Sequence, residues 1–134
     1  MPTTPLPDEV RALLAEPRPA VIATVRTDGQ PVTVATWYLL DGEKILVNLD
    51  HSRIRLQHLR ADPRVALTVL DENWYTHVSI VGHVVEIVAD DDMAGIDRIA
   101  THYTSKPYPN RESARVNVWV EIDRWHGWGA TRST

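Results

Sequence analysis

The order of apolar and polar residues along the chain predicts six β-strands and three short helices. Residues 20–25 form a dense apolar run rich in β-branched side chains, which is typical of a buried strand. Residues 115–125 alternate strictly, which predicts a strand with one buried face. The inward residues of this last strand are Val116, Val118, Val120 and Ile122. The six predicted strands cover residues 20–25, 32–40, 45–49, 65–70, 76–88 and 115–125.

Asp-Gly pairs separate the first three predicted strands. Asp28-Gly29 lies between the first and second, and Asp41-Gly42 lies between the second and third. Glycine adopts positive φ without steric cost, so this pair favours a tight hairpin turn. Two hairpins in succession predict an antiparallel meander rather than alternating strands and helices.

Three segments carry helical periodicity instead. They are residues 7–15, residues 52–61 with Ser52 as the expected N-cap, and a helix that one of Asp90, Asp91 or Asp92 caps and that ends near Tyr103. Within the second helix, the spacing predicts a shared face for Ile54, His58 and Ala61. Gly82 lies in the middle of the long fifth strand, where it predicts a β-bulge or a bend.

Six strands in 134 residues are most economically curled into a small barrel. The expected fold class is therefore mainly β with α+β margins, a six-stranded antiparallel barrel with short helices. We find no internal repeat or linker, so residues 1–134 are expected to form a single domain.

Composition narrows the function classes. Fourteen Lys and Arg residues against eighteen Asp and Glu residues give a net charge of −4, whereas nucleic-acid-binding domains are normally basic. The absence of cysteine excludes a thiolate nucleophile and a cysteine metal site. No apolar run reaches the roughly 20 residues of a membrane span, and the first residues lack the apolar core of a signal peptide. We therefore expect a cytoplasmic protein with no nucleic-acid or membrane partner.

The sequence motifs of hydrolases, phosphate-binding loops and zinc proteases are absent. The six histidines do not show metal-ligand spacing, so no metal site is expected. No catalytic acid, base or nucleophile can be assigned from the residues alone.

Ser52, Arg53 and Arg55 form the most informative cluster of polar residues. Two arginines in the first turn of a helix oppose the helix dipole, so helix stability does not explain them. A bound phosphate does, because the free N–H groups of the helix start, the Ser52 hydroxyl and both guanidinium groups would converge on it. The alternative is a solvated basic helix without a ligand.

The aromatic residues are five Trp, four Tyr and no Phe. Trp and Tyr are favoured where one edge of the ring stays wet, as in ligand pockets and subunit interfaces. This inventory predicts either a pocket or a dimer interface without a ligand. The residues concerned are Trp37, Tyr38, Trp74, Tyr75, Trp125 and Trp128.

Taken together, these segments resemble the pyridoxamine-phosphate-oxidase-like split β-barrel superfamily, and within it the flavin/deazaflavin oxidoreductases that use coenzyme F420. The match covers nearly the whole chain, to about Ile122. The segments that carry it are Val21-Ile22-Ala23-Thr24-Val25, Asp28-Gly29-x-Pro31, Trp37-Tyr38, Asp41-Gly42, the block from Ser52-Arg53-x-Arg55 to Asp62-Pro63-Arg64, and the strand glycine Gly82.

The resemblance implies a homodimer with the cofactor in the groove between two barrels. It implies that Arg53 and Arg55 hold the cofactor phosphate together with Ser52. Arg55 stands where the family often has lysine, which keeps the charge and changes the donor geometry. The residues that the resemblance implies around the cofactor ring are Val34, Ala35, Thr36, Trp37, Asn48, Leu49 and Asp50.

The function implied is hydride transfer between a reduced deazaflavin and a small organic substrate. The first alternative is an FMN-binding oxidase or reductase of the same fold, and the second is a non-enzymatic module that binds a cofactor or pigment. The anionic tail of coenzyme F420 would need cations beyond the phosphate site. Arg60, Arg64, Lys106 and Arg111 are the candidates.

Overall fold

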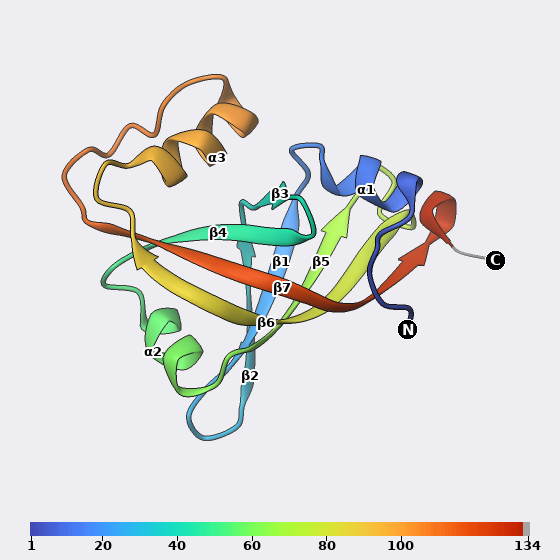
Figure 1. The fold of residues 1–134 in the computed structure, drawn as a ribbon, viewed down its shortest axis with the longest axis horizontal. Helices are drawn as coiled ribbons and strands as arrows, with labels where there is room; N and C mark the ends of the chain where they lie inside the picture. The colour runs from blue at the N-terminus through green and yellow to red at the C-terminus, as the bar shows by residue number, and fades with distance from the viewer. Residues whose placement is uncertain (133–134) are drawn as a thin grey trace.

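The computed structural model describes residues 1–132, which form a curled antiparallel β-sheet with three α-helices around it (Figure 1). The helices are α1 (Asp8–Leu14), α2 (Ile54–Ala61) and α3 (Ala94–Thr104), and a short 3-10 turn, η1 (Gly129–Thr131), follows the last strand. The strands are β1 (Ala20–Val25), β2 (Pro31–Thr36), β3 (Leu39–Asp41), β4 (Lys44–Asp50), β5 (Arg64–Leu70), β6 (His77–Ala89) and β7 (Arg115–Trp128).

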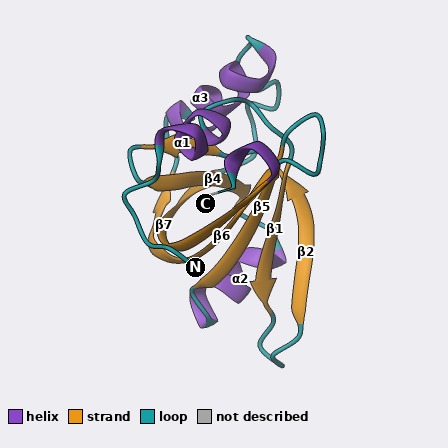
Figure 2. Cartoon of the chain, turned by 90° about the vertical axis from the view of Figure 1, so that its right-hand side faces the viewer, coloured by secondary structure: helices purple, strands orange, loops and turns teal. Residues whose placement is uncertain are grey.

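The sheet has seven strands in the order β2-β1-β5-β6-β7-β4-β3, and all neighbours are antiparallel. Within residues 1–132, the edge strands β2 and β3 do not pair with each other, so the sheet curls without closing. Figure 2 shows this curl from the side. The mainly β antiparallel architecture is confirmed, and the closed six-stranded barrel is wrong in both strand number and closure.

The seventh strand arises because the predicted strand 32–40 breaks at Trp37 and Tyr38. Tyr38 is buried, and its hydroxyl donates to the carbonyl oxygen of Leu14 at 2.8 Å, which fixes the side chain inside the molecule. Trp37 remains 37% exposed. The chain therefore leaves β2 at one edge of the sheet and enters β3 at the other edge.

Both predicted hairpins are confirmed. Gly29 has φ of +89° in the turn between β1 and β2, and Gly42 has φ of +62° in the turn between β3 and β4. The predicted irregularity at Gly82 is also confirmed, because the pairing of β6 with β7 shifts register between Val81 and Gly82. A Cβ atom at Gly82 would collide with the carbonyl oxygen of Glu121, so the two strands approach closely here.

The helices lie close to the predicted residue ranges, but the predicted N-cap of α2 differs from the observed one. The N-cap of α2 is Arg53, which makes no side-chain cap hydrogen bond, so the prediction that Ser52 caps this helix is wrong. The Ser52 hydroxyl instead donates to Asp50 Oδ1 at 2.7 Å. Ile54, His58 and Ala61 share a face of this helix as predicted, but that face is not the buried one, because the buried residues are Leu56 and Leu59.

At α3, Met93 occupies the N-cap position. The Asp90 carboxylate nevertheless accepts hydrogen bonds from the backbone N–H groups of Gly95 and Ile96, both at 2.9 Å. Asp90 is only 4% exposed, so this contact gives the oxygens of a buried carboxyl group two donors of the helix start. An aspartate therefore accepts hydrogen bonds from the start of this helix, as predicted, although it does not occupy the N-cap position.

The core lies inside the curl of the sheet. The four inward residues predicted for β7 are all buried, and α1 closes the core with Val10, Leu13 and Leu14. Trp125 is buried too, and its Nε1 donates to the carbonyl oxygen of Thr3. Within residues 1–132 no helix is both long enough and apolar enough to span a bilayer.

Candidate functional site

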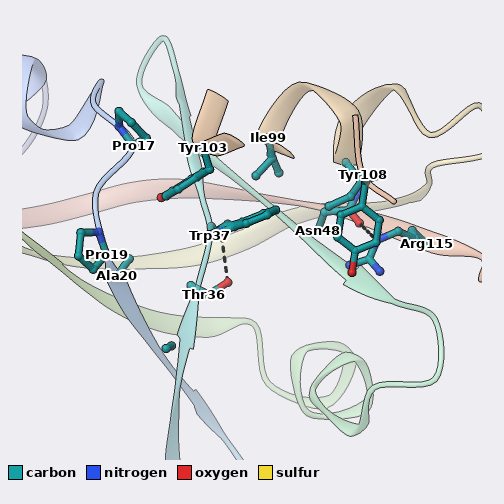
Figure 3. A pocket seen from close by; sticks show the side chains of 12 residues that line it. Pro17, Pro19, Ala20, Thr36, Trp37, Asn48, Ile99, Tyr103, Tyr108 and Arg115 are labelled. Carbon is teal, nitrogen blue, oxygen red and sulfur yellow. Dashed lines mark hydrogen bonds between the residues drawn. The ribbon is translucent and has the colours of Figure 1, made fainter. Parts of the chain in front are cut away.

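A cavity of about 640 Å³ opens between β2, β4, α3 and the loop that precedes β7 (Figure 3). Four residues predicted to contact a cofactor ring line it together, although they come from the end of β2, the residue that follows it and β4, which is not a neighbour of β2 in the sheet. These four are Ala35, Thr36, Trp37 and Asn48.

Aromatic side chains form one wall of this cavity. Trp37 stacks on Tyr103 of α3 with ring centroids 5.1 Å apart and planes 11° apart, and Tyr108 meets Trp37 edge-on at 6.5 Å. The Tyr103 hydroxyl donates to the carbonyl oxygen of Arg18 at 2.6 Å. Burial raises the pKa of Tyr103 to about 12, so this hydroxyl stays protonated and holds the wall rather than accepting a proton.

The opposite end of the cavity is polar. The Arg115 Nε donates to Asn48 Oδ1 at 2.7 Å, and the guanidinium carbon lies 4.6 Å from the centre of the Tyr108 ring. Asn48 in turn donates to Asp90 Oδ2 at 3.0 Å and to Asn117 Oδ1 at 2.8 Å. A connected network of this kind fixes the orientation of each member.

Asp97 of α3 anchors the loop that carries Tyr108. Its Oδ1 accepts from the Tyr108 backbone N–H at 3.0 Å and from Arg111 Nη1 at 2.6 Å. The Arg111 guanidinium and the Tyr108 N–H together lower the pKa of Asp97. One carboxylate thus sets the position of a cavity wall.

A second cavity of about 600 Å³ lies farther toward the start of β2, at residues 32–34, and against α2. Arg55, Val34 and His58 line it, so two more of the predicted site residues face this space. Within residues 1–132, neither Arg53 nor Arg55 forms an ion pair with a carboxylate. Partial burial and the neighbouring Arg53 charge lower the pKa of Arg55. Two positive charges that lie close together without a carboxylate partner are a suitable arrangement for binding an anion.

The remaining predicted site residues line neither cavity. Leu49 is buried in the core. Asp50 accepts from both the backbone N–H and the hydroxyl of Ser52, which lowers the pKa of Asp50 to about 2. The Ser52 hydroxyl is therefore engaged by a carboxylate.

Two of the four cations proposed for an anionic tail are already neutralised. Arg64 pairs with Asp62 at 2.7 Å and Arg111 pairs with Asp97 at 2.6 Å. In the part of the chain that the structure describes, Arg60 and Lys106 form no ion pair. The expectation that all four are available is wrong for Arg64 and Arg111.

Away from both cavities, His83 lies across the strand pair from Glu121 and Asp123. Its Nδ1 is 2.9 Å from Asp123 Oδ2, and the ligand atoms of the three residues lie within 4.8 Å of one another. The sequence spacing of the histidines could not indicate this group, because β6 and β7 bring it together. A hydrogen bond between His83 and Asp123 accounts for the contact without a metal.

Sequence reasoning missed Tyr103, Tyr108 and Arg115 as cavity residues. The pattern places Tyr103 only near the end of a helix and Arg115 only at the start of a strand. The pairing of Asn48 with Asn117 and of Asp50 with Arg115 brings this strand beside β4, and that register is not readable from the sequence.

The comparisons with known proteins agree with this architecture. The sequence profile of the family described as pyridoxamine 5'-phosphate oxidase matches residues 6–129. Among solved structures, an F420 reductase is 30% identical, with 90% of this chain and 98% of that chain covered and a TM-score of 0.82. A conserved hypothetical protein from Mycobacterium tuberculosis is 26% identical, with 94% of this chain and 86% of that chain covered and a TM-score of 0.75.

A protein from Listeria innocua, named as a candidate pyridoxamine 5'-phosphate oxidase, is 16% identical and covers 90% of this chain and 95% of its own, with a TM-score of 0.69. At that identity the likeness concerns the fold alone. A search among curated proteins found no match.

Proposed function

This chain belongs to the pyridoxamine 5'-phosphate oxidase family, and we propose that it is a coenzyme F420-dependent oxidoreductase that reduces a small organic substrate. The observation that carries the proposal is that two cavities follow one another along the edge strand β2. One is aromatic, and the other is lined by Arg55, which like its neighbour Arg53 forms no ion pair within residues 1–132. Support for the deazaflavin comes from the F420 reductase, which is 30% identical across 90% of this chain.

The residues present fit such a cofactor. Its phosphate would lie against Arg53 and Arg55, which form no ion pair within residues 1–132. Its planar ring would lie along Ala35, Thr36 and Trp37, where the cavity offers a flat aromatic surface. The two cavities follow one another along β2, so an elongated cofactor would run along this edge strand to occupy both.

When bound, the deazaflavin supplies a hydride, and the protein's contribution is to hold the reactants in place. The stacked pair of Trp37 and Tyr103 would orient a planar partner and exclude water from one face. The hydroxyl of Tyr103 keeps its proton because burial raises its pKa and a backbone carbonyl accepts its hydrogen bond. If the cofactor supplies the hydride and the protein only holds the reactants, the protein needs no catalytic nucleophile. The absence of hydrolase motifs in the sequence is consistent with this.

We propose further that the working form is a homodimer. The edge strand β2 is exposed on both faces along much of its length, in contrast to β1 beside it, whose residues are alternately buried. Val34 is 38% exposed on this edge. A second copy of the chain would cover the edge and supply the missing wall of both cavities.

FMN is the second candidate cofactor, because the family to which the chain belongs is named for an oxidase of the flavin type. Its phosphate would use the same two arginines. The difference between the cofactors lies beyond the phosphate, where only coenzyme F420 has a polyanionic tail.

Absorbance titration of the apo-protein with coenzyme F420 and with FMN, side by side, tests the proposal. We expect saturable binding of coenzyme F420 with the higher affinity, because its tail adds charge contacts. Tighter binding of FMN would transfer the assignment to the flavin, and binding of neither would overturn the proposed function.

A further inference from the structure

His83, Glu121 and Asp123 form a group of three possible metal ligands on the outer face of the sheet. His83 lies on β6, and the two acids lie on β7. One ligand atom from each residue lies within 4.8 Å of those of the other two. Within residues 1–132, none of the three lines either of the two cavities described above. The group is therefore separate from the candidate cofactor site.

The pairing of β6 with β7 places His83 directly opposite Glu121. Directly opposed residues of an antiparallel pair lie on the same face of the sheet, with Cβ atoms about 4.5–5.5 Å apart. This is the outer face, because Glu121 is exposed while Val120 and Ile122 on either side of it are buried. The backbone itself therefore holds this histidine and this carboxylate side by side.

A β-bulge brings Asp123 to the same histidine. Ile122 and Arg124 pair with successive residues of β6, so Asp123 between them has no partner in the ladder. In a regular ladder Asp123 would lie opposite Val81, two residues before His83. In the structure its Oδ2 lies 2.9 Å from His83 Nδ1. Bulges redirect side chains in this way and are frequent next to functional sites.

The hydrogen bond between His83 and Asp123 accounts for their contact without a metal, but it does not involve Glu121. Within residues 1–132 Glu121 forms no ion pair. The spacing of 2.9 Å also suits two ligands of one ion, because atoms bound at about 2.1 Å and at a right angle lie about 3.0 Å apart. An ion can therefore take the place of the shared proton, with Glu121 as the third ligand.

The charges around the group favour a divalent cation. Two carboxylates and a neutral imidazole together balance an ion of charge +2. The neighbouring arginines bind other groups. Arg64, opposite His83 on β5, donates to Asp62 at 2.7 Å, and Arg124 donates to the carbonyl oxygen of Met1 at 3.0 Å. Neither guanidinium therefore neutralises the two acids of the group.

We propose that His83, Glu121 and Asp123 bind one zinc ion. The imidazole favours an ion of this kind over Mg²⁺ and Ca²⁺, which prefer oxygen ligands. Because the ion would join β6 to β7 at the bulge, it would stabilise the strand pair where the ladder is interrupted. This inference does not rest on the proposed function, since it involves neither cavity.

Isothermal titration calorimetry of the full, untagged chain with zinc chloride, in the absence of a cofactor, tests the site. We expect saturable binding of one ion per chain, and calcium chloride in about tenfold excess should not displace it. Zinc should also raise the melting temperature, because an ion that binds only the folded chain stabilises it. Absence of saturable binding, or displacement of zinc by calcium, would overturn the proposal.

Variants that each remove one ligand assign the ion to this group. His83→Gln, Glu121→Gln and Asp123→Asn should each weaken zinc binding at least about tenfold, because even groups that only orient a metal ligand contribute that much. The two amide variants keep the shape of the side chain, and they carry the test if circular dichroism shows that His83→Gln does not fold. Parental affinity in folded Glu121→Gln and Asp123→Asn would contradict the inference.

Two control variants exclude zinc binding by the surface in general. His77→Gln removes another histidine of β6 and should bind zinc as the parent does. Lys44→Gln removes the cation opposite Glu121 on β4 and should bind zinc at least as tightly as the parent. Binding that His77→Gln weakens and His83→Gln does not would assign the ion to other histidines and overturn the proposed site.

Discussion

At the scale of single residues, the arginines divide into those that the chain neutralises and those that it leaves unpaired. Arg18, Arg98 and Arg111 each bind a carboxylate. In the described residues Arg53, Arg55 and Arg115 have no such partner, and Arg55 and Arg115 each line a cavity. In a chain with a net charge of −4, unpaired cations gathered around cavities are a specific feature rather than a general basic surface.

Truncation of the phosphate pair tests its role. We expect Arg53→Ala and Arg55→Ala each to weaken binding of the cofactor by about 1.5–3 kcal/mol, the range for a hydrogen bond to a charged group. Binding is measured by absorbance titration, and circular dichroism confirms that each variant is folded. Asp8→Ala, an exposed residue of α1, is the control and should bind as the parent. Parental affinity in both arginine variants would contradict the phosphate assignment.

At the scale of secondary structure, the local pattern of apolar residues and the residues at the turns suffice to predict most of the strands and helices. The alternation in β7 and the glycines at 29 and 42 depend on neighbours in sequence, and these elements were predicted correctly. The break at Trp37 and Tyr38 was missed, because it depends on the hydroxyl of Tyr38 reaching Leu14 of α1. An apolar pair inside a strand pattern gives no local sign of such a contact.

The sequence predicts only part of the candidate site, because the rest depends on contacts between residues far apart in the chain. Residues close to one another in sequence, such as Ala35, Thr36 and Trp37, were found together in one cavity. Tyr108 and Arg115 reach that cavity only through the long-range pairing of β4 with β7 and the anchoring of a loop. The sequence predicts that Ser52 caps a helix, whereas the carboxylate of Asp50, two residues before it, accepts the Ser52 hydroxyl instead.

The contacts by which Asp97 holds the loop before β7 should depend on pH. The Asp97 pKa is lowered from its ordinary value of 3.8, so the ionised carboxylate stabilises the folded loop above that value. This stabilisation is lost as the pH falls through the lower, folded-state pKa. We expect the Tyr108 amide resonance in NMR spectra to titrate with a midpoint below 3.8.

Variants of the ion pair separate this effect from general acid unfolding. Arg111→Gln should move the midpoint upward, toward the ordinary value, because it removes the main cause of the lowered pKa. Asp97→Asn should abolish the titration. Arg98→Gln, which removes a different ion pair of α3, should leave the midpoint unchanged. A midpoint at 3.8 or above in the parent would show that Asp97 does not hold the loop.

At the scale of the whole molecule, the two cavities lie along the edge strand β2, four of whose six residues are exposed. An uncovered edge with apolar side chains is prone to association, which natural sheets avoid by covering it. A second copy of the chain would cover this edge, and it would also enclose the two cavities.

Light scattering at micromolar concentration measures the assembly directly. We expect a particle of twice the chain mass of 15.2 kDa. The variant Val34→Asp places a charge on the exposed edge and should reduce both dimerisation and cofactor affinity, because desolvating an unpaired charge at an interface is costly. A parental protein that scatters as a single chain would contradict the homodimer and leave the cavities as sites of one protomer.

The choice between coenzyme F420 and FMN depends on cations beyond the phosphate, and the ion pairs of Arg64 and Arg111 reduce the candidates to Arg60 and Lys106. Arg60 lies seven residues after Arg53, which places the two on nearly the same face of α2 and about 10 Å apart along the helix axis. Lys106 follows α3, which Figure 1 shows on the opposite side of the sheet from α2. A tail that continues from the phosphate site would therefore meet Arg60 before Lys106.

This geometry predicts how salt acts on binding. Affinity for coenzyme F420 should fall with salt more steeply than affinity for FMN, because more charge contacts are screened. Arg60→Gln should flatten the slope for coenzyme F420 and leave the slope for FMN unchanged, whereas Lys106→Gln and Arg64→Gln should alter neither. The slopes come from absorbance titrations at several salt concentrations. Equal slopes for the two cofactors in the parent would remove the argument for a tail site, and flattening by Lys106→Gln alone would place the tail along α3 instead of α2.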